Sequence, residues 1–335
     1  MYHPFRLGFL THLRGSDNPR RIYAETLELF ETAEALGFDA GWVAQHHFKR
    51  EAGFLPSPLP FLAAVAERTQ RIRLGTSIVV LPLESPLRVA EDAAVVDLLS
   101  GGRLELGVGS GANPQEFAPF DVDIAMRHQR TTEGLDLIKR AFRGDVWGDG
   151  SQQLQPPAPT LTERIWLSGL SPMGATYAAS HEAGLLLSRA AWGHEEPTDR
   201  VQLPVAQTYR NAWTHQASSP RIGLSRGIYI AADKSTALKA MQADLTPAIN
   251  GMVKQGRMAP GLSFETYCKR FHIAYGHPEE VAASLQADQV FSHATELILQ
   301  LDPIFPTLDQ TLRMFEQIAT QVAPALGWRR TIDGL

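Results

Sequence analysis

Segments patterned like buried β-strands alternate with segments patterned like amphipathic helices along nearly the whole chain of 335 residues. Parallel strands need long crossover connections, and a helix is the usual one. Eight strand–helix repeats in a chain of this length are typical of a (β/α)8 TIM barrel, an α/β fold. We therefore expect one barrel domain over residues 1–335, with no linker dividing it.

The individual elements follow from apolar periodicity and from residues that start or stop a helix. Residues 21–36 carry apolar side chains at helical spacing, and Gly37 follows as a stop. Residues 73–80 form a nearly continuous apolar run, as buried parallel strands do. The expected strands are residues 6–11, 42–44, 73–80, 104–108, 165–168, 184–188, 222–231 and 296–301. The expected helices are residues 21–36, 58–68, 86–99, 128–142, 172–182, a part of 198–216, 235–255, 278–287 and 307–323.

Two segments interrupt this alternation. Residues 143–163 are rich in glycine and proline, which predicts an inserted loop or small hairpin after the fourth helix. Residues 257–264 form a second connection of similar composition. A doubly wound sheet shows the same alternation, but residues 8–11 lack the glycine fingerprint that such a fold carries after its first strand.

Composition limits the classes of function. The formal net charge of −5, without a concentrated basic stretch, argues against nucleic acid or a membrane surface as partner. The apolar run over residues 74–83 is too short to span a bilayer, and no signal-peptide core is found, so a cytoplasmic protein is expected. The single cysteine, Cys268, excludes an internal disulfide and suits either a nucleophile or a buried inert thiol.

Two adjacent histidines, His46 and His47, follow the second expected strand. Chemistry in parallel α/β folds takes place at the carboxyl ends of strands, and histidine exchanges protons near neutral pH. Since neighbouring strand residues face opposite sides, only one of the two should point into the barrel mouth. Adjacent histidines make a poor metal site, and a purely structural pair is the alternative. The other nine of the 11 histidines are interpreted as surface or capping residues.

Two strand ends are rich in small residues. Gly107, Gly109 and Gly111 alternate after the fourth strand, which suits either a tight turn or a platform for a flat ligand. Residues 168–175 form a strand end, a turn and a helix start at Pro172, which is either an ordinary cap or an anion site. No nucleophile elbow, zinc-protease motif or pair of carboxylates appears, which suggests that a cofactor supplies the reactivity.

Several longer motifs follow one another in a set order. They are residues 33–39, Trp42, 46–48, 73–76, 81–82, 86–92, 97–107, 116–117, 165–172 and 277–281. In order and spacing these motifs resemble the bacterial luciferase-like, flavin-dependent monooxygenase family, densely up to about residue 190 and more thinly beyond.

The resemblance implies a luciferase-like TIM barrel that takes reduced FMN from a separate flavin reductase, a two-component system. It implies that the bound flavin forms a hydroperoxide with O2, which oxygenates a small or medium organic substrate. It also implies a homodimer, packed through early helices such as residues 58–68 and 86–99.

The resemblance further assigns roles to residues. His46 matches the catalytic histidine, residues 169–171 with Met173 and Gly174 match the phosphate site, and Ser77–Ile78 matches a position of a non-prolyl cis peptide under the flavin ring. The implied cofactor-binding residues are Ser77, Ile78, Gly109, Ser110, Ser168, Gly169, Leu170, Ser171, Met173, Gly174 and Arg189.

The chain departs from luciferase itself at three positions. Luciferase has a glutamate at Gln45, a cysteine at Gly109 and an arginine at Ser110, so light emission is not implied. Arg189 is a candidate substitute for the missing phosphate charge. Residues 251–276 resemble the mobile lid of the family, or are a plain surface loop.

Three other functions remain open. They are a deazaflavin-dependent oxidoreductase of the same fold, a non-catalytic flavin-binding subunit, and a barrel aldolase or isomerase that uses the turn at residues 168–174 for a substrate phosphate. The last lacks an evident lysine or acid pair at a strand end.

Overall fold

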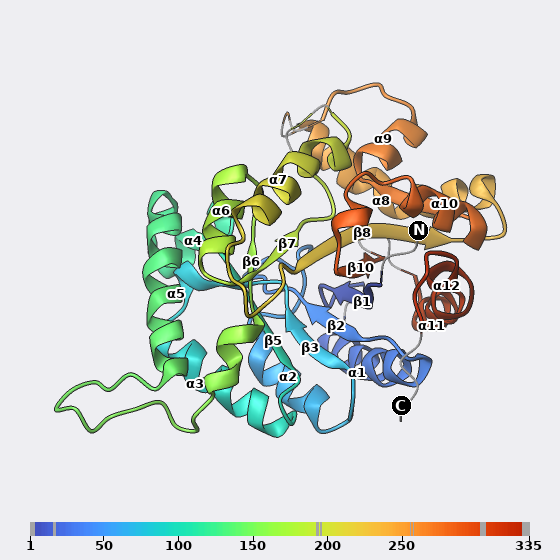
Figure 1. Ribbon diagram of the computed structural model, residues 1–335. Helices are drawn as coiled ribbons and strands as arrows, with labels where there is room; N and C mark the ends of the chain where they lie inside the picture. The colour runs from blue at the N-terminus through green and yellow to red at the C-terminus, as the bar shows by residue number, and fades with distance from the viewer. Residues whose placement is uncertain are drawn as a thin grey trace.

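The computed structural model describes residues 4–15, 18–191, 194, 196–254, 256, 258–301 and 306–329. Within these residues eight parallel strands close into a barrel, because β10 pairs with both β1 and β8 (Figure 1). Around the wall the strands are β1 (Arg6–Thr11), β2 (Ala40–Val43), β3 (Arg73–Thr76), β5 (Leu104–Gly109), β6 (Ile165–Ser168), β7 (Gly184–Leu187), β8 (Ile222–Ile230) and β10 (Glu296–Gln300). The predicted TIM barrel is confirmed.

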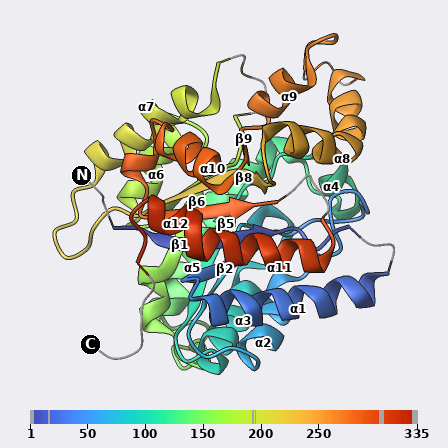
Figure 2. The same ribbon diagram turned by 90° about the vertical axis from the view of Figure 1, so that its right-hand side faces the viewer.

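Helices surround this wall, and Figure 2 shows α11 lying beside α1 on one side of it. They are α1 (Pro19–Leu36), α2 (Pro58–Ala66), α3 (Pro86–Leu99), α4 (Pro114–Phe117), α5 (Arg127–Arg143), α6 (Pro172–Ser180), α7 (Thr198–Ala212), α8 (Lys234–Lys254), α9 (Phe264–Arg270), α10 (Pro278–Gln286), α11 (Leu308–Gln317) and α12 (Ala323–Ala325). None of the helices in the described part of the chain combines the length and apolar character needed to cross a bilayer.

Local sequence explains where these helices begin and end. Helix α1 starts at Pro19, whose missing N–H costs nothing in the first turn, after Asn18, whose side chain accepts from the N–H of Arg21. It ends at Gly37, which has a left-handed φ of 91° that side chains other than glycine rarely adopt. The same proline start, behind a serine, asparagine or histidine, recurs in α2, α3, α4, α6 and α10.

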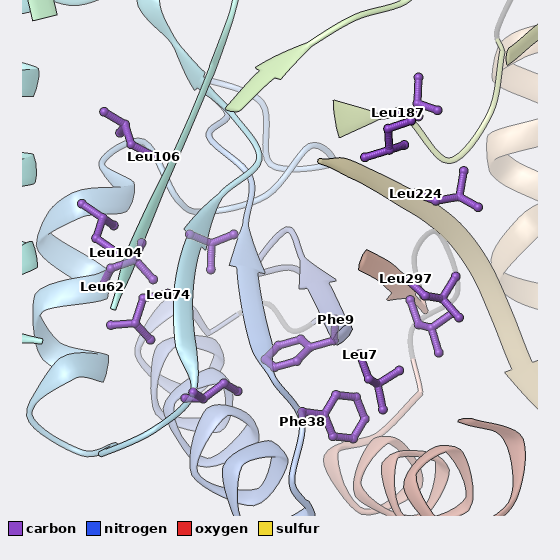
Figure 3. Packing of buried hydrophobic residues seen from close by; sticks show 14 of the residues in the cluster. Leu7, Phe9, Phe38, Leu62, Leu74, Leu104, Leu106, Leu187, Leu224 and Leu297 are labelled. Carbon is purple, nitrogen blue, oxygen red and sulfur yellow. The ribbon is translucent and has the colours of Figure 1, made fainter. Parts of the chain in front are cut away.

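The main core lies between the strands and the surrounding helices. Figure 3 shows Leu62 of α2 beside Leu74 and Leu104 of the wall, all three without measurable exposure. The inside of the barrel is filled differently, by Trp42 and Trp166, whose rings meet edge to face with centroids 5.6 Å apart. Glycines in neighbouring strands make room for the two indoles, since a Cβ on Gly75 or Gly184 would come within 2.1 or 2.2 Å of them.

A buried ion cluster lies on the same inner side of the wall. Its centre is the Glu105 carboxylate, which accepts a hydrogen bond of 2.7 Å from the Trp166 indole and one from the Nε of Arg73. Guanidinium nitrogens of Arg6 and Arg221 lie 3.5 and 3.7 Å from its oxygens. One carboxylate thus links four strands, β1, β3, β6 and the start of β8, across the barrel.

Two predicted segments can be compared directly with the structure. The strand expected over residues 73–80 is two pieces, β3 and β4 (Val79–Val80), because the chain turns at a cis peptide between Ser77 and Ile78. The inserted loop after α5 is found as predicted, with Trp147 bridged to Gln152 in a small hairpin that projects from the barrel in green in Figure 1.

Residues 251–276 are not a plain surface loop, so that alternative is wrong. They contain α9 and β9 (Ile273–Gly276), which pairs with the outer half of β8. Together with α8 these elements enclose a second hydrophobic cluster, in which Cys268 is fully buried. Burial raises the pKa of this thiol to about 12, which supports the inert interpretation of Cys268. Movement of the segment as a lid stays a prediction.

We predict that Glu105→Gln lowers the free energy of unfolding by about 3 kcal/mol, the lower end of the range for breaking a buried ion pair. The physical reason is that three arginines would lose their shared counter-ion. Denaturant unfolding followed by circular dichroism measures the change, with Glu91→Gln in an exposed pair with Arg88 as the matched control. The control should lose no more than about 0.5 kcal/mol. Equal losses in both variants would contradict a structural role for the cluster.

Candidate active site

His46 and Glu116 form a hydrogen-bonded pair at the carboxyl ends of β2 and β5. The Nδ1 of His46 lies 3.2 Å from a carboxylate oxygen of Glu116, and Asn113 donates to the same oxygen at 2.9 Å. Burial opposes ionisation of Glu116, but the hydrogen bonds from His46 and Asn113 outweigh it and lower the pKa of this carboxyl. Because an ionised carboxylate only accepts, His46 carries its proton on Nδ1, and its Nε2 is the nitrogen available for proton exchange.

A second histidine lies against the first. The ring of His12, which follows β1, stacks on the ring of His46 with centroids 5.4 Å apart and an angle of 21° between the planes. The remaining histidines were expected to be surface or capping residues, and His12 is partly exposed but makes this further contact. His272 is also partly exposed, and its Nε2 lies 2.9 Å from the buried carboxylate of Asp288. Neither contact is local in sequence, so no spacing could have revealed it.

His46 and His47 have different surroundings, as the alternation of neighbouring residues predicted. The His46 side chain keeps 28% of its surface exposed, whereas His47 is buried against Gln45 and the edge of Phe120. Burial lowers the pKa of His47, and the neighbouring His46 lowers it further, although Glu116 opposes both effects. Of the two histidines, His46 is therefore the one placed to meet a ligand.

The ends of β3, β5 and β6 converge beside this pair. The predicted cis peptide between Ser77 and Ile78 is present. A Cβ on Gly109 would lie 2.5 Å from the Ile78 side chain and 2.4 Å from the Ser168 hydroxyl, so only glycine lets these three strand ends approach so closely. Ser110 follows directly and is partly exposed. The structure thus brings together five of the predicted cofactor-binding residues.

The turn between β6 and α6 exposes backbone N–H groups. Ser171 is the N-cap of α6, and its hydroxyl accepts from the N–H of Gly174 at 3.2 Å. Leu170 and Met173 are 66% and 82% exposed. Within the described part of the chain, no hydrogen bond uses the N–H groups of Leu170, Ser171 or Met173. Free N–H groups at a helix start are suited to an anion, so the turn has the chemistry that a phosphate requires.

Arg189 stands at the end of the neighbouring strand, β7. Its guanidinium donates to the carbonyl of Phe271 at 3.1 Å and lies 5.7 Å from the centre of that ring. It is therefore held by the segment between α9 and β9. Its predicted contact with a phosphate is not among these interactions and stays a prediction.

Sequence reasoning missed the partners that hold the histidines. Glu116 belongs to one of the family motifs, but no role was predicted for it. Asn113 followed by Pro114, with Glu116 three residues after the asparagine, is a typical helix start. The Gln45 amide binds Glu84 at 2.6 Å, and no sequence signal relates these two positions. Across the described residues, His, Cys, Asp and Glu side chains nowhere gather in the threes that a metal ion requires.

Two curated relatives are monooxygenases by their names. The chain is 37% identical over 185 residues to 4-hydroxyprotoasukamycin monooxygenase of Streptomyces nodosus subsp. asukaensis, covering 52% of this chain and 49% of that protein. It is 31% identical over 209 residues to the oxygenase component of flavin-dependent trigonelline monooxygenase of Acinetobacter baylyi, covering 57% and 56%. The chain thus matches about half the length of these curated relatives.

A third relative is named for a different coenzyme, F420. The chain is 26% identical to F420-dependent glucose-6-phosphate dehydrogenase of Amycolatopsis mediterranei, over 78% of this chain and 84% of that one.

Solved structures share the fold. A monooxygenase of Streptomyces bottropensis superimposes with a TM-score of 0.79 at 24% identity, covering 96% of this chain and 99% of that one. The oxygenating constituent of 3,6-diketocamphane monooxygenase of Pseudomonas putida, solved in complex with FMN, gives a TM-score of 0.76 at 16% identity over 97% and 98%. The sequence profile of a family described as luciferase-like monooxygenase matches residues 5–296. The chain therefore belongs to the luciferase-like monooxygenase family.

Proposed function

We propose that this protein is an FMN-dependent monooxygenase that receives reduced FMN from a separate flavin reductase and uses O2 to oxygenate a small or medium organic substrate. The observation that carries the proposal is the His46–Glu116 pair at the barrel mouth, beside the convergent ends of β3, β5 and β6. The flavin-dependent monooxygenases among the relatives support it.

The residues present fit FMN. Ser77, Ile78, Gly109, Ser110 and Ser168 would lie along the flavin ring, where the absence of a side chain at Gly109 keeps the strand ends close together. The exposed N–H groups of the turn at residues 169–174 would hold the phosphate, with the charge of Arg189 as a further contact. When bound, reduced flavin supplies the electrons with which O2 oxygenates a substrate.

The protein's own part is to manage a proton beside the flavin. Glu116 holds the proton of His46 on Nδ1, so that Nε2 can accept or release a proton without the ring reorienting. The stacked His12 ring restricts rotation of the His46 ring further. Together these contacts preorganise one nitrogen atom for proton exchange.

Binding of reduced FMN is the first test, and we expect saturable binding in an anaerobic titration. Arg189→Ala should weaken this binding by about 1–3 kcal/mol, the usual size of a hydrogen bond to a charged group. Arg88→Ala, which removes an exposed arginine of α3, is the control and should leave the affinity unchanged. Equal affinities for the two variants would remove Arg189 from the phosphate site. No binding to the wild type, with binding of the deazaflavin coenzyme F420 instead, would favour the dehydrogenase alternative.

Exposure of the reduced complex to air then tests the oxygen chemistry. We expect oxidised FMN and hydrogen peroxide to appear slowly in the wild type. His46→Ala should release both faster than the wild type, because the imidazole that holds a proton in place beside the flavin is missing. FMN affinity should change only a few-fold, and His128→Ala on the exposed face of α5 is the control. Identical time courses in wild type and His46→Ala would remove His46 from the mechanism.

We also propose a homodimer that packs through α3. Val95, Leu98 and Leu99 are spaced to share one helix face, and they are 43%, 69% and 48% exposed. Exposed apolar patches of this kind mark protein interfaces. Sedimentation velocity should show a dimer that Leu98→Asp converts to monomer, while Val146→Asp in the inserted hairpin leaves it intact. A wild-type monomer would contradict the proposal.

A further inference from the structure

The side-chain amide of Gln45 joins the two segments that carry the candidate site. Gln45 lies one residue before His46 and is 3% exposed. Its Oε1 accepts from the backbone N–H of Val80 at 2.6 Å, two residues after the Ser77–Ile78 peptide. Its Nε2 lies 2.6 Å from a carboxylate oxygen of Glu84. The histidine segment after β2 is thereby tied to β4 and the turn that follows it.

The orientation of this amide is determined by its partners. A backbone N–H only donates, so the atom facing Val80 must be the oxygen and the amide cannot be flipped. The nitrogen then faces three groups, which are Glu84, the carbonyl of Pro56 at 3.1 Å and the Nε2 of His47 at 2.9 Å. An amide nitrogen donates and cannot accept. The His47 nitrogen that faces it must therefore carry no proton.

The neighbouring His46 lowers the pKa of His47 and so favours the same state, whereas the negative charge of Glu116 raises it. Glu84 reaches His47 only through the Gln45 amide. The edge of Phe120 packs against the ring, with centroids 4.8 Å apart at 82°. Burial also lowers the pKa of His47. Below the pKa of an unfolded histidine, about 6.5, the unfolded chain therefore binds this proton more readily, and stability falls as the pH falls.

We propose that Gln45 is a positioning residue that holds His47 neutral, protonated on Nδ1 alone, and that keeps the His46 segment fixed to β4 through its bonds to Val80 and Glu84. Protonation of the His47 Nε2 would set an N–H against an N–H, and the amide that moves away from it would also lose its bonds to Val80 and Glu84. The consequence for catalysis rests on the proposed function, because the tied segments are those that would contact the flavin. Acid would then weaken binding of reduced FMN through His47, in addition to any effect of protonating the phosphate itself.

Gln45→Glu tests whether the donating amide of Gln45 keeps the His47 Nε2 unprotonated, because a carboxylate can instead accept from a protonated His47. The introduced carboxylate would face that of Glu84, so the double variant Gln45→Glu/Glu84→Gln keeps a single carboxylate and an amide in contact. Glu84→Gln alone retains the Gln45 amide and serves as the matched control. The midpoint of His47 is measured by NMR titration of its ring protons, assigned by their loss in His47→Asn.

In both variants that carry Gln45→Glu, the His47 midpoint should rise by about one to three pH units, the usual effect of an adjacent opposite charge. In Glu84→Gln it should stay near that of the wild type. An unchanged midpoint in the double variant would overturn the inference, as would a rise of equal size in Glu84→Gln. This titration needs no flavin and is therefore independent of the proposed function.

Anaerobic titrations with reduced FMN across the same pH range test the coupling. Binding to the wild type should weaken as His47 becomes protonated. In the double variant the part of this pH dependence that is due to His47 should be lost over that range, because the introduced carboxylate accepts from protonated His47. The part due to the phosphate of FMN should be the same in both proteins. A pH profile of binding that is identical in both proteins would overturn the coupling. Failure of the wild type to bind reduced FMN at any pH would overturn the proposed function instead, and the histidine titration would still decide the role of Gln45.

Discussion

Closure of the parallel sheet into a barrel is the constraint on which the rest of this molecule depends. β10 pairs with β1 on one side and β8 on the other, so every strand of the wall has two neighbours and the carboxyl ends meet at one rim. Segments that are far apart in sequence come together because their strands are neighbours in this wall. Glu116 lies 70 residues from His46, and the two meet because β2, β3 and β5 are adjacent in the wall.

Much of the fold could be predicted, since periodicity, proline starts and glycine stops are local signals. The helix over residues 86–99 and the strands over 6–11 and 165–168 have the predicted bounds. The strand over residues 73–80 was not predicted correctly from its apolar pattern, which carries no sign of a turn. Only the resemblance to the family marked the cis peptide at Ser77–Ile78. β9 was also missed, since its place is set by pairing with β8 rather than by its own short sequence.

The residues of the candidate site that stand at strand ends could be predicted from the sequence. The residues that hold them in place by hydrogen bonds could not. His46, Gly109 and Ser171 stand at positions that the barrel pattern alone marks. The supporting hydrogen bonds of Glu116, Gln45 and Glu84 join distant segments, and their geometry is set only when β2, β3 and β5 pair. The residues proposed to contact a ligand are therefore marked in the sequence, while the contacts that orient them are not.

The single cysteine, Cys268, can report on the part of the molecule formed by α8, α9 and β9. Cys268 lies among the side chains that join α8 and α9 to β9, and its thiol stays protonated at neutral pH. A thiol-selective reagent can react with it only while α9 is separated from the sheet. The rate of that single modification therefore measures how often α9 separates from the sheet, in the unaltered protein and without an added label.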